Sequence, residues 1–304
     1  MLKKQTDKMK IFNRITLAIF CLITITSYSQ DLLAELEAET SNEPEKVMAT
    51  FKGIKLINAN TVETTKKKTL EFRITHRFGN VGEEGEHTLF GLDNASNIRF
   101  SFDYGVTDNL SIGIGRSKTN EHIDGILKFR FLHQTNKLPF SAAYFTNVAL
   151  TPSSKQFNEF AHRLSYTHQL IVASKISSGI SLEILPTLVH RNYVESEINP
   201  ENNAYDENDL ISIGFAARIK ITKRTAFVAD YFYTLSNYRT NNTALAFYNP
   251  FALGFEFETG GHVFHVNFTN SAGIIENDFI PYTNDTWENG QFKFGFNISR
   301  VFNI

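Results

Sequence analysis

Nine histidines are the first candidates for metal or acid–base chemistry in this 304-residue chain. His262 and His265 are three residues apart, a spacing that places them on opposite faces of a β-strand. His162 and His168 share a face but are separated by much of a strand's length. Because a metal site needs several such side chains at bonding distance, the spacing predicts no metal, and no cofactor is expected.

His168 is also the best candidate for a catalytic base. A nucleophilic enzyme would need a serine or another nucleophile within hydrogen-bond reach of this ring. The neighbouring apolar runs, residues 140–144 and 180–184, carry no serine on the face that His168 occupies, and no G-x-S-x-G motif occurs. The sequence therefore does not predict an enzyme, and His168 is interpreted as an isolated interfacial ring.

Charged residues form a larger group of candidates, because they alternate with apolar residues along much of the chain. If the apolar face contacts lipid, the charged face points inward. There it could line a polar channel that orients a solute, or form ion pairs within a filled interior. The basic candidates are Arg73, Arg99, Lys128, Arg130, Arg163, Arg218, Lys220 and Lys293. The acidic candidates are Glu71, Asp103, Glu183, Asp230, Glu256 and Glu258.

The order of these charges along the chain predicts an uneven field. Arg99 and Arg218 come from the first two thirds, whereas Asp230, Glu256 and Glu258 come from the last third. On a closed barrel we expect the two groups to occupy different arcs of the wall, where they would set ion preference. The alternative is that acids and bases pair across adjacent strands, as Arg218 and Asp230 could.

Twelve segments that would carry these charges show the period-two alternation of β-strands with one apolar face. With their flanks they are roughly 9 to 13 residues long, enough to cross a bilayer when tilted. The sequence predicts an all-β fold, a transmembrane antiparallel up-and-down β-barrel of about twelve strands, with ten or fourteen as alternatives. The segments centre on residues 69–78, 98–106, 110–115, 127–131, 140–144, 164–170, 180–184, 211–219, 227–235, 251–257, 264–268 and 291–304.

Short and long connections alternate between these segments. The turns 107–109 and 222–224 are short, whereas the connections 192–208 and 271–289 are long and polar. Outer-membrane barrels have this arrangement, with tight periplasmic turns and long external loops. A soluble β-sandwich gives no reason for the alternation or for 28 phenylalanines.

The first 68 residues lack this regular pattern. Residues 1–30 are expected to be a cleaved signal peptide, because a basic leader precedes the apolar run 15–25, which is too short to span a bilayer. Residues 31–68 are expected to be a periplasmic or lumen-inserted segment, in which 50–65 could instead form an extra strand. The barrel itself is expected to occupy residues 69–304.

The C-terminal run, residues 291–304, carries Phe292, Phe294 and Phe296 on one face. It is similar to the closing strand by which assembly machinery recognises outer-membrane barrels, although Phe302 is not the terminal residue. The 30 basic residues nearly balance the 32 acidic ones, so no nucleic-acid partner is expected. The expected partners are therefore lipid and the assembly machinery, with a small polar solute or a periplasmic or surface protein as further possibilities.

Several stretches also match a known family. They include T-F-K-G-I-K-L-I-N at 50–58, L-E-F-R-I-T-H-R-F-G at 70–79, F-D-Y-G-V-T-D at 102–108 and F-G-F-N-I-S-R-V-F at 294–302. In these stretches the chain resembles a family of uncharacterised bacterial outer-membrane β-barrels, a domain of unknown function. The resemblance extends from about residue 50 to the end. It implies the fold and the outer membrane of a Gram-negative bacterium, and no established activity.

The leading expectation is a small porin-like or transport-associated channel with a mixed-charge polar lumen. The alternative is a plugged structural or partner-binding barrel without channel activity, whose external loops or N-terminal segment dock other proteins.

Overall fold

The computed structural model describes residues 45–82, 86–152, 157 and 159–304. The expected signal peptide and residues 31–44 lie outside this described part. Among the described residues, no helix is both long enough and apolar enough to span a bilayer.

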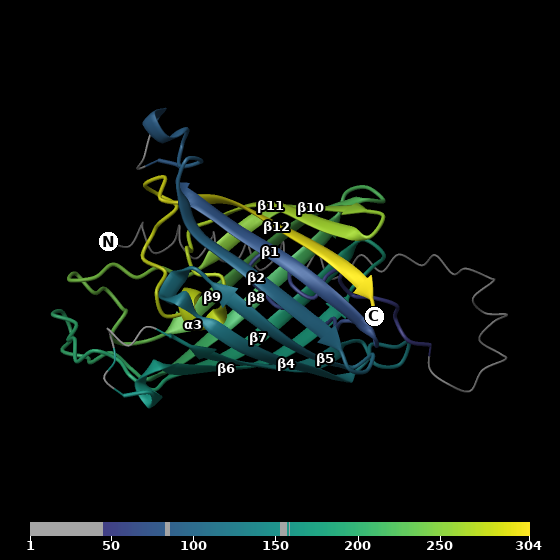
Figure 1. The fold of residues 1–304 in the computed structure, drawn as a ribbon, viewed down its shortest axis with the longest axis horizontal. Coiled ribbons are helices and arrows are strands. Elements are labelled where there is room, and N and C mark those ends of the chain that lie inside the picture. Colours follow the sequence, from purple (N-terminus) through teal and green to yellow (C-terminus); the bar gives the residue numbers. More distant parts are fainter. Residues whose placement is uncertain (1–44, 83–85, 153–156, 158) are drawn as a thin grey trace, which may run out of the picture. The chain divides into compact units, whose positions relative to one another are not determined.

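The described chain forms one closed antiparallel barrel, in which every strand pairs with its sequence neighbours and β1 pairs with β12 (Figure 1). The predicted fold class and the count of twelve strands are therefore confirmed. The strands are β1 (Thr69–Asn80), β2 (Ala95–Gly105), β3 (Leu110–Ser117), β4 (Ile123–Leu132), β5 (Ser141–Leu150), β6 (Leu164–Lys175), β7 (Ile180–Arg191), β8 (Asp209–Lys220), β9 (Thr225–Leu235), β10 (Phe251–Thr259), β11 (His262–Thr269) and β12 (Lys293–Asn303). The helical turns are η1 (Glu86–Thr88), η2 (Thr119–Glu121), η3 (Ala161–Arg163) and α3 (Glu276–Phe279).

The two rims of the barrel differ in the length of their connections. Only residues 106–109 join β2 to β3 and only 260–261 join β10 to β11, whereas 192–208 join β7 to β8 and 270–292 join β11 to β12. The C-terminus lies at the rim with short turns, opposite the long loops (Figure 1). In outer-membrane barrels the short turns are periplasmic and the long loops external, and we use these names for the two rims.

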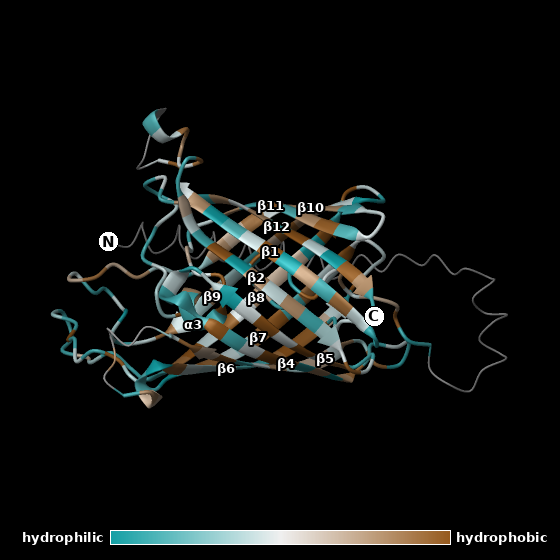
Figure 2. Cartoon of the chain, viewed as in Figure 1, coloured by the Kyte–Doolittle hydropathy of each residue, from teal (hydrophilic) through white to brown (hydrophobic). Residues whose placement is uncertain are grey.

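The outer wall is a belt of exposed apolar side chains. Figure 2 shows hydrophobic residues alternating with hydrophilic ones along the strands, as brown and teal bands. Phe100, Phe102, Phe215 and Phe255 are each more than a third exposed. An apolar surface of this extent would be unfavourable in water, but it is the surface that contacts hydrocarbon in a membrane.

The inner wall is polar over some strands and apolar over others. On β5 to β9 the buried inward side chains include Phe145, Ile171, Leu185 and Phe232, which belong to one hydrophobic cluster. Gly214 makes room for Phe232, because a Cβ atom there would lie 2.5 Å from Cε1 of the ring. This half of the barrel interior is therefore packed like the core of a globular protein.

We predict that Phe255→Arg strongly impairs assembly, because the charge would enter hydrocarbon near the middle of β10, at a cost of about 2–4 kcal/mol. Folded and unfolded fractions can be separated by heat-dependent gel mobility after refolding into lipid. Leu245→Arg, which introduces the same charge at an exposed position in the external loop 236–250, is the matched control. Equal folded yields for the two variants would contradict the assignment of the lipid face.

Candidate functional site

Residues 45–68, which we call the plug, run inside the barrel. At the periplasmic rim Lys46 pairs with Thr135, and the backbone N–H of Val47 donates to the carbonyl of Gln134 at 2.8 Å. The chain reverses at residues 54–61, where the N–H of Leu56 donates to the carbonyl of Ala59 at 2.9 Å. It returns to the same rim to begin β1. Residues 50–65 are thus a lumen-inserted hairpin and not an additional wall strand.

Charged residues of the wall bind the tip of the plug. Asp230 on β9 accepts hydrogen bonds from the backbone N–H of Asn58 at 2.8 Å and from its side-chain amide at 3.0 Å. Arg77 on β1 donates to Oδ1 of Asn58 at 3.0 Å. Lys128 on β4 donates to three plug carbonyls, the closest being that of Ile54 at 2.8 Å. Such charge-assisted bonds fix both the position and the conformation of the plug.

The plug also contributes apolar side chains. Phe51, Leu56, Ile57 and Val62 are almost completely buried and join the hydrophobic cluster on β5 to β9. By the usual measure, burial of each such side chain stabilises the plug by roughly 1.5–3 kcal/mol. The plug is therefore held by packing on one side of the lumen and by charged groups on the other.

A second insertion enters from the external rim. Residues 271–289, which we call the lumen loop, contain the short helix α3, all of whose residues are buried. The ring of Phe279 packs against Phe232 with centroids 4.9 Å apart. Asn277 is held by Thr167, whose hydroxyl donates to its side-chain oxygen at 2.9 Å. The lumen loop thus fills the external half of the interior.

The plug and the lumen loop meet at Glu276. Its Oε1 lies 3.1 Å from Nζ of Lys55 and accepts a hydrogen bond from Nδ2 of Asn60 at 2.9 Å. A cavity of about 40 Å³ remains beside this contact, lined in part by Arg73 and Asp103. It has room for one or a few water molecules. The plug and the lumen loop are thus in direct contact at this level of the lumen.

Three predicted basic residues of the lumen form ion pairs with acidic residues of the wall or of the lumen loop. Arg73 contacts Glu71 at 2.5 Å on its own strand, and Arg99 contacts Asp124 on β4 at 2.5 Å. Gly115 makes the second pair possible, because a Cβ atom there would lie 2.0 Å from the guanidinium of Arg99. Lys293 pairs with Asp285 of the lumen loop.

The expected separation of acidic and basic arcs is wrong. Arg218 on β8 forms an ion pair with Glu256 on β10 at 2.7 Å, reaching across β9, and His265 contacts the same carboxylate at 3.3 Å. Arg218 does not pair with Asp230, which binds Asn58 of the plug. Acids and bases thus meet across the barrel wall, because inward side chains of nearby strands are within reach of one another.

The remaining predicted residues contact the plug, are buried on the inner face of the wall, or lie at the rims of the barrel. Arg130 pairs with Glu63 of the plug at 2.9 Å, and Glu258 pairs with Lys52 at 3.1 Å. Asp103 and Glu183 are buried on the inner face. Lys220 is exposed at the periplasmic end of β8, and Arg163 ends η3 at the external rim. That these candidates line a conducting pore stays a prediction.

A larger cavity of about 590 Å³ opens at the external end. We call it the external vestibule. Its lining includes His122, Arg163, Arg191, Tyr193, Asp278 and Tyr282. Because Asn277 and Asp278 also belong to its lining, α3 contributes to the vestibule while Glu276 of the same helix holds the plug.

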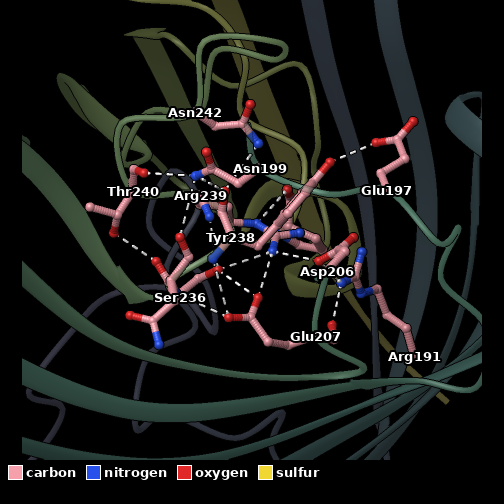
Figure 3. Close-up of polar contacts among 12 residues, drawn as sticks. Arg191, Glu197, Asn199, Asp206, Glu207, Ser236, Tyr238, Arg239, Thr240 and Asn242 are labelled. Carbon is pink, nitrogen blue, oxygen red and sulfur yellow. Dashed lines mark hydrogen bonds and ion pairs between the residues drawn. The ribbon is translucent and has the colours of Figure 1, made fainter. Parts of the chain in front are cut away.

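Two external loops, residues 192–208, which line part of the vestibule, and residues 236–250, are fastened to each other, as Figure 3 shows. Asp206 lies 2.8 Å from Nη2 of Arg191 and 2.7 Å from Nη1 of Arg239. Burial alone would raise the pKa of Asp206, but hydrogen bonds and charge attraction from the two arginines outweigh burial and lower it below its usual value. Burial, followed by the hydrogen bond to Glu197, raises the pKa of Tyr238 to about 12.

The histidines do not converge on a site. Among the described residues, no group of three or more His, Cys, Asp or Glu side chains could hold a metal ion. His168 lies on the outer wall, where its Nδ1 is 2.6 Å from the hydroxyl of Tyr144 and 3.3 Å from that of Thr146.

The analysis of the sequence missed the apolar lining of the lumen. The available signal was a break in the alternation: Phe145, Ile171, Leu185 and Phe232 are large apolar residues on the face that should be polar. Such positions require an apolar partner inside the barrel. The run G-I-K-L-I at 53–57 is the segment that supplies it.

The closed barrel, its apolar belt and its alternating rims define a β-barrel of the outer membrane. The chain belongs to the family described as membrane bound beta barrel domain (DUF5777), whose model matches residues 51–302. No curated protein matches the chain.

Solved structures share the barrel fold at low sequence identity. The NanC porin is 8% identical, with a TM-score of 0.47 and coverage of 77% of this chain and 99% of that one. The KdgM porin is 7% identical, with a TM-score of 0.44 and coverage of 77% and 99%. The COG4313 outer membrane channel from Pseudomonas putida F1 is 10% identical, with a TM-score of 0.42 and coverage of 79% and 98%.

The depressed pKa of Asp206 predicts a pH-dependent fastening of the external loops. Ionised Asp206 stabilises the fastened loops above its ordinary pKa of 3.8, and this stabilisation is lost as the pH falls through the lower pKa of the folded state. Amide hydrogen exchange in residues 192–208 and 236–242, corrected for intrinsic rates, should accelerate between about pH 6 and about pH 3.

Asp206→Asn is the control for this prediction. The variant should exchange quickly at both pH values, because a neutral amide cannot form ion pairs with Arg191 and Arg239. A pH step of the same size in the variant would assign the effect to another group.

Proposed function

We propose that this protein is a channel of the Gram-negative outer membrane that its own plug closes at rest. The observation that supports this most directly is the contact of Lys55 and Asn60 of the plug with Glu276 of the lumen loop, which lies beside a cavity of about 40 Å³. The proposal combines the polar lumen of the first expectation with the plugged barrel of the alternative.

The chemistry of the wall around the plug argues for a plug that can move. Arg73, Asp103, Lys128 and Asp230 are buried on the inner face. Burying charged groups costs desolvation free energy that their contacts offset only in part, so a permanently filled barrel gains little from them compared with apolar packing. The same groups would be favourably hydrated on the wall of a water-filled channel, which is what displacement of the plug would produce.

Two further proposals concern biogenesis. We infer that residues 1–30 are removed as a signal peptide, since a basic leader precedes a short apolar run. We also infer that β12, with its row of outward aromatic residues, is the strand that the assembly machinery recognises.

The first test is conductance in planar bilayers. The parent protein should show no steady conductance, whereas a variant lacking residues 46–64 should conduct continuously, because the deletion removes the plug and leaves β1 intact. Leu56→Ser with Ile57→Ser tests the same point in a full-length chain, since it removes two apolar anchors of the plug and keeps its polar contacts.

A reversible lock provides the control. Asn58 and Thr269 touch at 3.4 Å between Nδ2 and Oγ1, so cysteines at both positions should hold the plug in place when oxidised. The locked protein should stay closed until a reductant is added. Steady conductance of the parent equal to that of the deletion variant would contradict a resting plug.

The second test concerns the contact between the plug and the lumen loop. Glu276→Gln removes the charge that compensates Lys55, a lysine whose side chain is only 14% exposed. Loss of one partner of a buried pair typically costs about 3–5 kcal/mol, so we expect transient openings to become far more frequent. Single-channel recording measures their frequency.

Glu121→Gln is the matched control, since its carboxylate is exposed and lies 4.0 Å from Arg116. If both variants open equally often, Glu276 does not hold the plug. Lys55→Gln combined with Glu276→Gln should open less often than Glu276→Gln alone, because no uncompensated charge remains.

A further inference from the structure

The external vestibule has the size of a ligand site and lies outside the closed part of the lumen. Its volume of about 590 Å³ falls within the usual range for pockets that hold small molecules. It opens toward the external rim, so a solute can reach it while the plug is in place. Binding there can therefore be measured whether or not the barrel conducts.

Most charges of the vestibule already have partners. Arg191 contacts Asp206 and donates to the hydroxyl of Tyr282 at 3.0 Å. His122 lies 2.9 Å from Oγ1 of Thr151 and 3.1 Å from Oδ1 of Asp278. These groups shape the walls, and their charges are already compensated within the protein.

Arg163 differs from these residues. It lines the vestibule and is partly buried, and its Nε, like that of Arg191, is buried without a hydrogen-bond partner. In the described part of the chain, no hydrogen bond or ion pair engages the rest of its guanidinium. A partly desolvated guanidinium without a counter-ion favours an anion, which it can bind through two parallel hydrogen bonds.

Aromatic rings lie in the same cavity. Tyr193 packs against His162 with ring centroids 5.1 Å apart, and Tyr282 lies beneath the guanidinium of Arg191 at 5.4 Å. Both tyrosines line the vestibule. Such rings offer apolar faces and hydroxyl groups to a solute that has both carbon–hydrogen and hydroxyl surfaces.

The acidic residues of the lining restrict the kind of anion. Glu195, Glu197 and Asp278 belong to the same cavity. Their field opposes a doubly charged phosphate more than a singly charged carboxylate. The position of a single uncompensated arginine among these acids favours an anionic group of low charge.

We propose that the external vestibule is a binding site for a small carboxylate-bearing solute, with Arg163 as the residue that binds the carboxylate. The remainder of the solute lies against the aromatic and hydroxyl groups of Tyr193 and Tyr282. This proposal concerns capture at the external surface and is independent of whether the plug moves.

The test is calorimetric titration of the full-length folded barrel in detergent. Glucuronate and gluconate, each with one carboxylate, are the carboxylate probes, and glucose, which carries a hydroxymethyl group where glucuronate carries a carboxylate, is the matched neutral probe. At least one carboxylate should bind, and glucose should bind at least tenfold more weakly. Arg163→Gln should weaken carboxylate binding by about tenfold or more.

Arg116→Gln is the control variant, because Arg116 is an exposed arginine that is not part of the vestibule lining. It should bind the carboxylates like the parent protein, and amide exchange in the external loops confirms that both variants are folded. Absence of binding by both carboxylates, equal binding of glucose, or unchanged binding in Arg163→Gln would each overturn the proposal. Tighter binding of glucose 6-phosphate than of glucuronate would replace the carboxylate by a phosphate.

Discussion

The structure depends on the pairing of β1 with β12. Their register runs from Thr69 opposite Asn303 to Asn80 opposite Lys293, with one irregularity after Arg77. Hydrocarbon offers no water to the polar groups of an open strand edge, so a sheet can cross the membrane only when it closes on itself. Closure fixes the outer wall as apolar, and it also creates an interior whose width is set by the number of strands.

The interior of this barrel combines two ways of filling that space. On β5 to β9, Phe145 and Phe232 pack with Leu56 and Ile57 of the plug as in a globular core. Charged side chains, on these strands and on the others, bind backbone groups of the plug or one another, as Asp230 does with the N–H of Asn58 and Lys128 with three carbonyls. Apolar packing stabilises the plug without requiring particular bond angles, whereas the charged hydrogen bonds form only when the plug occupies one position.

The short helix α3 of the lumen loop contacts the plug and also lines the external vestibule. Glu276 of α3 contacts the plug, and Asn277 and Asp278 of the same helix belong to the lining of the external vestibule. A group that binds in the vestibule therefore lies next to the element that closes the lumen. This arrangement gives capture of a solute and retention of the plug a common structural element, although the tests of the two are separate.

Local periodicity is enough to specify much of this barrel. The outward position of Phe255 and the inward position of Glu256 follow from strict alternation, which depends only on neighbours in the chain. The pairing of Arg218 with Glu256, by contrast, depends on the stagger of three strands, which alternation along a single strand does not specify. The plug has no periodic pattern, and its tip is held by hydrogen bonds with distant residues: Asp230 accepts from Asn58, and Arg77 donates to it. Its place in the lumen, and the vestibule above α3, arise from contacts between residues far apart in the chain, which alternation cannot encode.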